Sequence, residues 1–203
     1  MRLSEKTIEL NICAQINAFT KKRIVWFGLT QAQEAKAGFD AATKLNGRLL
    51  LIQFKASNKI MKKTGARRFQ LEHDQLQNLI NRVRTSKRSV YYAFPDIGTT
   101  SELQKAKGDI LGNTRFLDVS NLPNPYPSPT TNSKPIRVRS NNKHYADLLL
   151  NKITIHSDPL EFNLSTISDV LQDDENVTNN FDFNWIQDMN KSFTKNLKVA
   201  IIY

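Results

Sequence analysis

The chain has 203 residues, a formal net charge of +10 and one cysteine. Apolar residues make up 39% and charged residues 24% of it, a composition that excludes a mainly disordered chain. The single cysteine excludes a disulfide framework, and three scattered histidines argue against a zinc site of nitrogen and sulfur ligands, which leaves oxygen-ligated metals open.

The positive charge is concentrated in the first half of the chain. Residues 1–100 contain 18 basic and 7 acidic residues, a net charge of +11, whereas residues 101–150 carry +3 and residues 151–203 carry −4. A basic first half would attract a polyanion, of which nucleic acid is the commonest, although charge alone is equally compatible with a role in solubility.

No apolar run approaches the roughly 20 residues that span a bilayer, and no hydrophobic segment follows the first residues of the chain. We therefore expect a cytoplasmic protein with no membrane partner.

The first predicted elements are a helix and a short strand. Ser4 is a favourable N-cap for a helix that extends to about residue 19, and residues 24–27 predict a short buried strand. The apolar residues that repeat at helical spacing are Ile8, Ile12, Ile16 and Phe19.

A β-hairpin is predicted next. Residues 38–45 and 48–55 flank Asn46-Gly47, the preferred two-residue turn because both of its positions need positive φ. In that register Leu45 pairs with Arg48. The second strand has apolar residues at successive positions, which predicts burial on both of its faces.

A helix over residues 74–84 and a strand over residues 90–94 follow the hairpin. The order helix, strand, hairpin, helix, strand indicates an α/β fold in which helices flank a mixed sheet, with a crossover from the hairpin to the later strand.

The rest of the chain carries weaker signals. Residues 102–107 predict a short helix and residues 114–119 a strand. A proline-rich loop over residues 121–140 separates the first 120 residues from a smaller, acidic C-terminal element over residues 141–203. That element ends in an apolar segment that predicts a terminal strand.

The predicted hairpin gathers three polar side chains. Its register puts Asp40 opposite Gln53 and Gly38 opposite Lys55, so that Asp40, Gln53 and Lys55 project to one side of the sheet. Burial of these groups would cost a few kcal/mol each unless partners or a metal compensate. The alternative is a polar rim in which Asp40 and Lys55 form a surface ion pair.

This pattern resembles the PD-(D/E)XK, or restriction-endonuclease-like, nuclease superfamily. Asp40 is followed after twelve residues by Gln53-Phe54-Lys55 and preceded by Glu9 on the first helix, as in the Gln-x-Lys variant of Mrr-type restriction nucleases. The resemblance covers about the first half of the chain and implies a restriction-endonuclease-like mixed sheet over residues 1–120.

The resemblance also implies roles for the matching residues. Asp40, Gln53 and the carbonyl of Phe54 would bind Mg²⁺, or Mn²⁺ in its place, and Glu9 would hold metal-bound water from the helix. Lys55 would position or deprotonate the attacking water and stabilise charge on the phosphate. Glu5, one turn before Glu9, is an alternative to it.

The chain departs from the family pattern at two positions. Gly38-Phe39 stands before Asp40 where the family often has proline, and Gln53 replaces an acidic residue. The glutamine removes one negative charge from the predicted metal site, which shifts more of the metal binding to Asp40 and Glu9.

The segment after the hairpin predicts a flexible basic loop that follows a phosphate backbone, or alternatively a plain solvated loop. Its basic residues are Lys59, Lys62, Lys63, Arg67 and Arg68.

The three histidines, His73, His144 and His156, have no metal-ligand spacing and read as ordinary surface or cap residues. The glycines form no nucleotide-binding motif, so we expect no nucleotide cofactor.

The expected function is Mg²⁺-dependent hydrolysis of DNA phosphodiester bonds, plausibly in restriction or another defence against foreign DNA. Cutting both strands would need two active sites, which implies a homodimer or a partner subunit. Two alternatives stay open: a non-catalytic nucleic-acid-binding subunit with a nuclease-like fold, which Gln53 favours, and a protein whose basic face binds an acidic protein partner.

Overall fold

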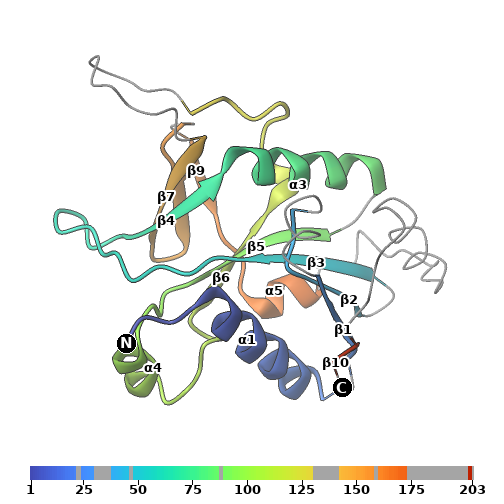
Figure 1. The fold of residues 1–203 in the computed structure, drawn as a ribbon, viewed down its shortest axis with the longest axis vertical. Helices are drawn as coiled ribbons and strands as arrows, with labels where there is room; N and C mark the ends of the chain where they lie inside the picture. Colours follow the sequence, from blue (N-terminus) through green and yellow to red (C-terminus); the bar gives the residue numbers. More distant parts are fainter. Residues whose placement is uncertain are drawn as a thin grey trace.

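The computed structural model describes residues 1–21, 24–29, 38–45, 48–86, 89–129, 142–157, 160–172 and 201–202. Their strands form a six-stranded and a four-stranded sheet (Figure 1). The strands of the larger sheet, in spatial order, are β10 (Ile201–Ile202), β1 (Trp26–Gly28), β2 (Ala41–Leu45), β3 (Arg48–Phe54), β5 (Ser89–Pro95) and β6 (Thr114–Asp118). Those of the smaller sheet are β4 (Arg67–Glu72), β7 (Lys143–Leu149), β8 (Lys152–Ile155) and β9 (Glu161–Asn163).

The larger sheet is mixed, as the sequence predicts. Strands β3 and β5 run parallel, whereas its other neighbouring strands are antiparallel. A parallel pair needs a crossover, and here the connection contains β4 and the helix α3 (His73–Ser86). The α/β class is therefore confirmed.

The predicted hairpin register is confirmed. Leu45 pairs with Arg48, and the ladder continues to Ala41 opposite Ile52. Asp40 extends it, because its backbone N–H donates to the carbonyl of Ile52 over 3.0 Å. The turn residues 46 and 47 lie outside the described residues.

Strand β3 is buried on both faces because a separate core covers each one. Leu49 and Leu51 belong to a core that contains α3 and the apolar face of the smaller sheet. Leu50, Ile52 and Phe54 belong to a second core with α1 (Glu5–Thr20) and α5 (Ile167–Gln172). Figure 1 accordingly shows α1 and α3 on opposite sides of the central sheet.

The predicted helices are confirmed with small changes at their ends. Helix α1 begins after Ser4, whose hydroxyl accepts a 3.0 Å hydrogen bond from the Thr7 N–H. The short helix predicted near residue 102 is α4 (Thr100–Lys105), which packs beside the second core and is capped by Thr99. No helix in the described part of the chain is long and apolar enough to cross a membrane.

The predicted flexible loop over residues 59–68 is wrong at its end, where β4 begins at Arg67. In β4 the apolar residues Phe69 and Leu71 face the core, while Arg68, Gln70 and Glu72 face outward. This period of two indicates a strand. The basic residues obscured that alternation in the sequence.

The C-terminal part of the chain completes both sheets. Strand β7 pairs with β4, β10 pairs with β1, and α5 contacts β6. The predicted boundary near residue 120 therefore does not coincide with the division between the sheets. Residues 122–129 of the proline-rich stretch have no regular structure, and its residues 130–140 lie outside the described part.

Candidate metal and nucleic-acid site

Asp40 and Gln53 meet at the open end of the hairpin. Gln53 Nε2 donates to Asp40 Oδ2 over 2.7 Å, and the backbone N–H of Phe54 donates to the same oxygen over 2.7 Å. Both side chains are buried, with residue exposures of 8% for Asp40 and 1% for Gln53. The predicted convergence of this carboxylate and this amide is therefore present, in the interior and not on a polar rim.

The third predicted ligand, the carbonyl oxygen of Phe54, faces the same amide. Gln53 Nε2 lies 3.1 Å from it, so one NH₂ group lies between the carboxylate of Asp40 and the carbonyl of Phe54. Gln53 Oε1 is buried and has no hydrogen-bond partner among the described residues. Rotation of the amide would turn that oxygen toward the other two and bring three oxygens together.

This donor set fits a hard divalent cation. A carboxylate, an amide oxygen and a backbone carbonyl are the ligand types that Mg²⁺ and Mn²⁺ take. An orphaned buried oxygen costs free energy that a cation would recover. Across the described residues, no group of three or more His, Cys, Asp and Glu side chains is arranged to hold a metal, so any ligand set here relies on neutral oxygens.

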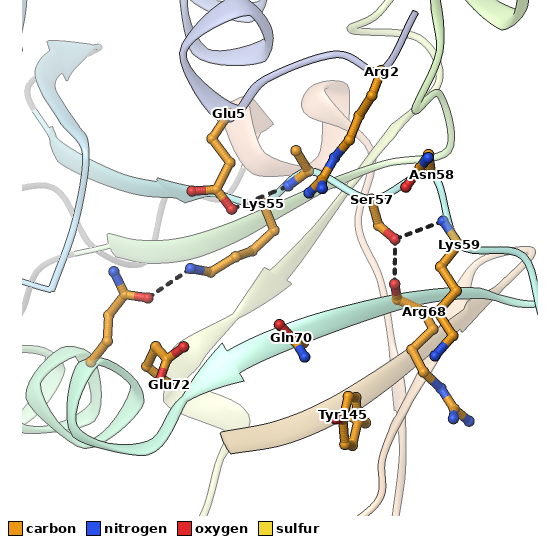
Figure 2. A pocket seen from close by; sticks show the side chains of 12 residues that line it. Arg2, Glu5, Lys55, Ser57, Asn58, Lys59, Arg68, Gln70, Glu72 and Tyr145 are labelled. Carbon is orange, nitrogen blue, oxygen red and sulfur yellow. Dashed lines mark hydrogen bonds between the residues drawn. The ribbon is translucent and has the colours of Figure 1, made fainter. Parts of the chain in front are cut away.

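Lys55 follows directly after β3 and is held by α3. Its Nζ donates to Gln75 Oε1 over 2.7 Å, and its backbone N–H donates to Ala93 O on β5 over 3.1 Å. The residue is only 7% exposed, yet its side chain lines a pocket (Figure 2). Lys55 is thus an ammonium fixed at a pocket wall.

The two candidate helix carboxylates lie at different places. Glu9 is buried, forms a 2.7 Å ion pair with Lys6 and lies near Gly28, next to β2. Burial raises the pKa of the Cys13 thiol, and the negative charges of Glu9 and Asp40 raise it further. The charges of Glu9 and Asp40 therefore both influence the Cys13 thiol, which lies between α1 and the sheet.

Glu5 faces the pocket instead. Its Oε1 accepts a 3.4 Å hydrogen bond from the N–H of Ala56, the residue after Lys55, and Figure 2 shows the carboxylate above the Lys55 side chain. Glu5 is therefore the helix carboxylate on the Lys55 side of the site, and Glu9 is the one on the Asp40 side.

The pocket has a volume of about 540 Å³ and lies between the start of α1, residues 55–59 and the outward face of the smaller sheet. Arg2 and Glu5 form one wall, and Arg68, Gln70 and Tyr145 form the opposite one (Figure 2).

The five predicted nucleic-acid contacts are distributed unevenly. Lys59 and Arg68 line the pocket, and Lys62 and Lys63 are exposed on a turn. The Arg67 side chain is only 3% exposed and donates hydrogen bonds to Ser57 O, Asp96 and Glu102. Arg67 is therefore a buried structural residue and is not available to contact nucleic acid.

The reading of all three histidines as ordinary surface or cap residues is wrong for His144. It is 1% exposed, and its Nε2 lies 2.9 Å from His73 Nδ1 while its Nδ1 contacts Ser157 Oγ. Burial and the neighbouring His73 lower the pKa of His144 from 6.5 to about 4. His156 is exposed at its side chain and contacts Asp147.

Sequence reasoning missed Gln70, Gln75 and Tyr145. The alternation of polar and apolar residues from Arg67 to Glu72 would have located Gln70 on an outward strand face, and the same alternation around Tyr145 marks β7. Gln75 carried no signal, because its role depends on how α3 packs against Lys55.

Comparison of the chain with protein-family models and with curated proteins finds no match.

Proposed function

We propose that this protein is a Mg²⁺-dependent endonuclease that hydrolyses DNA phosphodiester bonds, with a site of the restriction-endonuclease-like type. The observation that carries this proposal is the buried convergence of Asp40, Gln53 and the Phe54 carbonyl at the end of β3, where the next residue is Lys55, whose ammonium is held by Gln75. A carboxylate and a lysine buried at one strand end cost folding free energy, which a catalytic role explains.

Asp40, the rotated amide of Gln53 and the carbonyl of Phe54 would hold the cation. Mg²⁺, or Mn²⁺ in its place, would supply charge neutralisation at the phosphate and a bound water of lowered pKa. Glu9 supplies a further negative charge on the Asp40 side, from a position fixed by Lys6.

Lys55 would act on the phosphate and the attacking water. Gln75 holds its Nζ at the pocket wall, so the ammonium is positioned before substrate arrives, which is how preorganised charge stabilises a transition state. Arg2 and Lys59 add positive charge to the same pocket and would draw a DNA strand toward it.

Breaks in both strands would require two copies of the site, hence a homodimer or a partner subunit. Restriction of foreign DNA, or another form of defence, is the role that such an activity fits.

A second candidate is a DNA-binding subunit without catalysis. The observation in its favour is that Asp40 Oδ2 already accepts two hydrogen bonds of 2.7 Å, from Gln53 and from Phe54, so the carboxylate has partners without a cation. In that case the polar cluster would stabilise the hairpin, and the basic residues would bind DNA.

One assay separates the two candidates. Supercoiled plasmid is incubated with the protein in Mg²⁺, Mn²⁺ or EDTA, beside Asp40→Ala and Lys55→Ala. The matched controls are Asp74→Ala and Lys105→Ala, which change exposed residues outside the pocket.

Metal-dependent cutting that both site variants abolish and both controls retain supports the nuclease. Salt-sensitive plasmid binding without cutting supports the binding subunit. A protein that neither cuts nor binds DNA contradicts both.

A further inference from the structure

We propose that the pocket beside Lys55 holds one unpaired nucleotide of a DNA strand, with its base against Tyr145 and the edge of that base hydrogen-bonded by Gln70. This inference rests on the proposed function and names its substrate class: single-stranded DNA, or duplex DNA with unpaired bases.

Arg68 lies over the ring of Tyr145 on the outward face of the smaller sheet. The guanidinium of Arg68 lies 5.6 Å from the centroid of the Tyr145 ring. Asp147 holds that guanidinium with two hydrogen bonds of 2.6 Å, and this pairing is the main cause of the raised pKa of Arg68. The guanidinium is therefore positioned in advance, and a base would stack on the face of the Tyr145 ring that Arg68 does not cover.

Gln70 lies directly opposite Tyr145 in the β4–β7 ladder. Side chains of an opposed pair project to the same face with Cβ atoms about 5 Å apart, so the amide reaches the edge of a base stacked on the ring. Gln70 is exposed and its side chain lines the pocket. An exposed amide offers a donor and an acceptor together, which match adenine N7 and N6, the bidentate pairing of glutamine with a base.

The opposite wall suits a phosphate. Two charged residues of the pocket are paired with residues outside it, Arg68 with Asp147 and Glu72 with Lys143. The remaining charged residues are the positive Arg2, Lys55 and Lys59 and the negative Glu5. A nucleotide with its base on the sheet side would place its phosphate toward Arg2, which lies across the pocket from Gln70 and Tyr145 in Figure 2. The volume of about 540 Å³ lies in the range of roughly 300–1,000 Å³ typical of small-ligand pockets.

The substrate must be unpaired because stacking needs a free base face. In a duplex both faces of each internal base are covered by its neighbours, and only base edges are exposed in the grooves. A tyrosine inside a concave pocket can therefore stack only on a base from a single strand, a loop, a strand end or a flipped position.

The test measures binding without cutting. The full chain is titrated into fluorescein-labelled single-stranded dA and dT oligonucleotides and a blunt duplex, with Ca²⁺ or EDTA and no Mg²⁺. The variants are Tyr145→Val, which keeps a strand-forming residue, Tyr145→Phe, which keeps the ring, and Gln70→Ala. Gln104→Ala is the control, since Gln104 is exposed on α4 outside the pocket.

We expect tighter binding of single strands than of duplex, and of dA than of dT. Tyr145→Val should weaken single-strand binding about 5- to 100-fold, the effect of losing one base–aromatic stack, whereas Tyr145→Phe should retain it. Gln70→Ala should remove the preference for dA, and Gln104→Ala should change nothing. Equal affinity for single strand and duplex, or unchanged binding by Tyr145→Val, would overturn the inference.

Failure of this inference and failure of the proposed function are distinguishable. Plasmid cutting that depends on Lys55, combined with no effect of Tyr145→Val on binding, overturns only the nucleotide pocket. Tyr145-dependent binding of single strands, combined with no cutting under any metal, supports the pocket and overturns the nuclease.

Discussion

Gln53 Nε2 donates a 2.7 Å hydrogen bond to Oδ2 of Asp40, which lies thirteen residues earlier in the chain. The same NH₂ group contacts the carbonyl of Phe54 over 3.1 Å. A neutral donor thus lies where the proposed cation would bind, and the competition between the amide N–H and a cation can be measured without any assay of cutting.

Gln53→Glu should make the protein depend on Mg²⁺ for stability. A second buried carboxylate beside Asp40 repels it, which lowers the melting temperature in EDTA. Bound Mg²⁺ removes that repulsion and stabilises the variant by about 2.7 kcal/mol when its free concentration is about 100 times the dissociation constant. Calorimetry with and without Mg²⁺ measures the difference.

The wild-type protein should respond less, because Gln53 supplies no charge to the site. Gln104→Glu introduces the same charge at an exposed position and should show no added Mg²⁺ response. If Mg²⁺ stabilised neither Gln53→Glu nor the wild type, a cation at these oxygens would be excluded.

Arg67→Met should destabilise the fold by about 2–4 kcal/mol, measured by urea unfolding. The buried guanidinium joins Ser57 O, Asp96 and Glu102, and its loss leaves the Ser57 carbonyl without this 2.8 Å bond. Arg67→Lys should not restore stability, because one ammonium cannot span three partners. Lys62→Met, on an exposed turn, should change the free energy of unfolding by less than about 0.5 kcal/mol.

Stability should fall on acidification between pH 6.5 and pH 4 because of His144. Burial and His73 lower the pKa of His144 in the folded state to about 4, whereas the unfolded chain takes up the proton near its ordinary pKa of 6.5. Stability from this group is therefore complete above pH 6.5 and is lost as the pH falls toward 4, by up to about 3 kcal/mol.

Urea unfolding at several pH values checks this expectation. His144→Gln cannot titrate, so its free energy of unfolding should fall less steeply over that interval than that of the wild type. Parallel curves for the two proteins would show that other groups cause the acid sensitivity.

Gly38→Ala should cost more stability than Gly65→Ala. Both glycines have positive φ, 84° and 73°, so each alanine pays about 1–2 kcal/mol for the left-handed backbone. A Cβ at Gly38 would also lie 3.1 Å from Gln75 O and 3.2 Å from Leu79 Cγ, whereas one at Gly65 meets no described atom within 4 Å. We expect the Gly38 variant to be less stable by about 1 kcal/mol or more in urea unfolding. Equal losses of stability in the two variants would show that α3 can shift to accommodate the Cβ at position 38 without a loss of free energy.

The hairpin register shows how much of the candidate site a local pattern can predict. Turn chemistry and a period of two define which residues face each other, and Leu45 indeed pairs with Arg48. The same register brings Gln53 onto Asp40 without reference to any distant element. The helix stripe was predictable for a similar reason at Ile8, Ile12 and Ile16, which are fully buried, but its predicted last member, Phe19, is 53% exposed.

The strand β4 shows where such prediction failed. Its basic residues suggested a loop, although Phe69 and Leu71 alternate with polar neighbours. Its partner is β7, and Gln70 meets Tyr145 only through that long-range pairing. No spacing in the sequence links two residues so far apart.

The sequence by itself determined the opening helix, the hairpin with its register, and the oxygen-rich end at Asp40 and Gln53, because each depends on residues close together in the chain. Only the tertiary structure decided that Lys55 is held by Gln75, that Arg67 is internal and that a second sheet forms a pocket wall. Those features depend on which elements share a core, and that choice is made by burial summed over the whole chain.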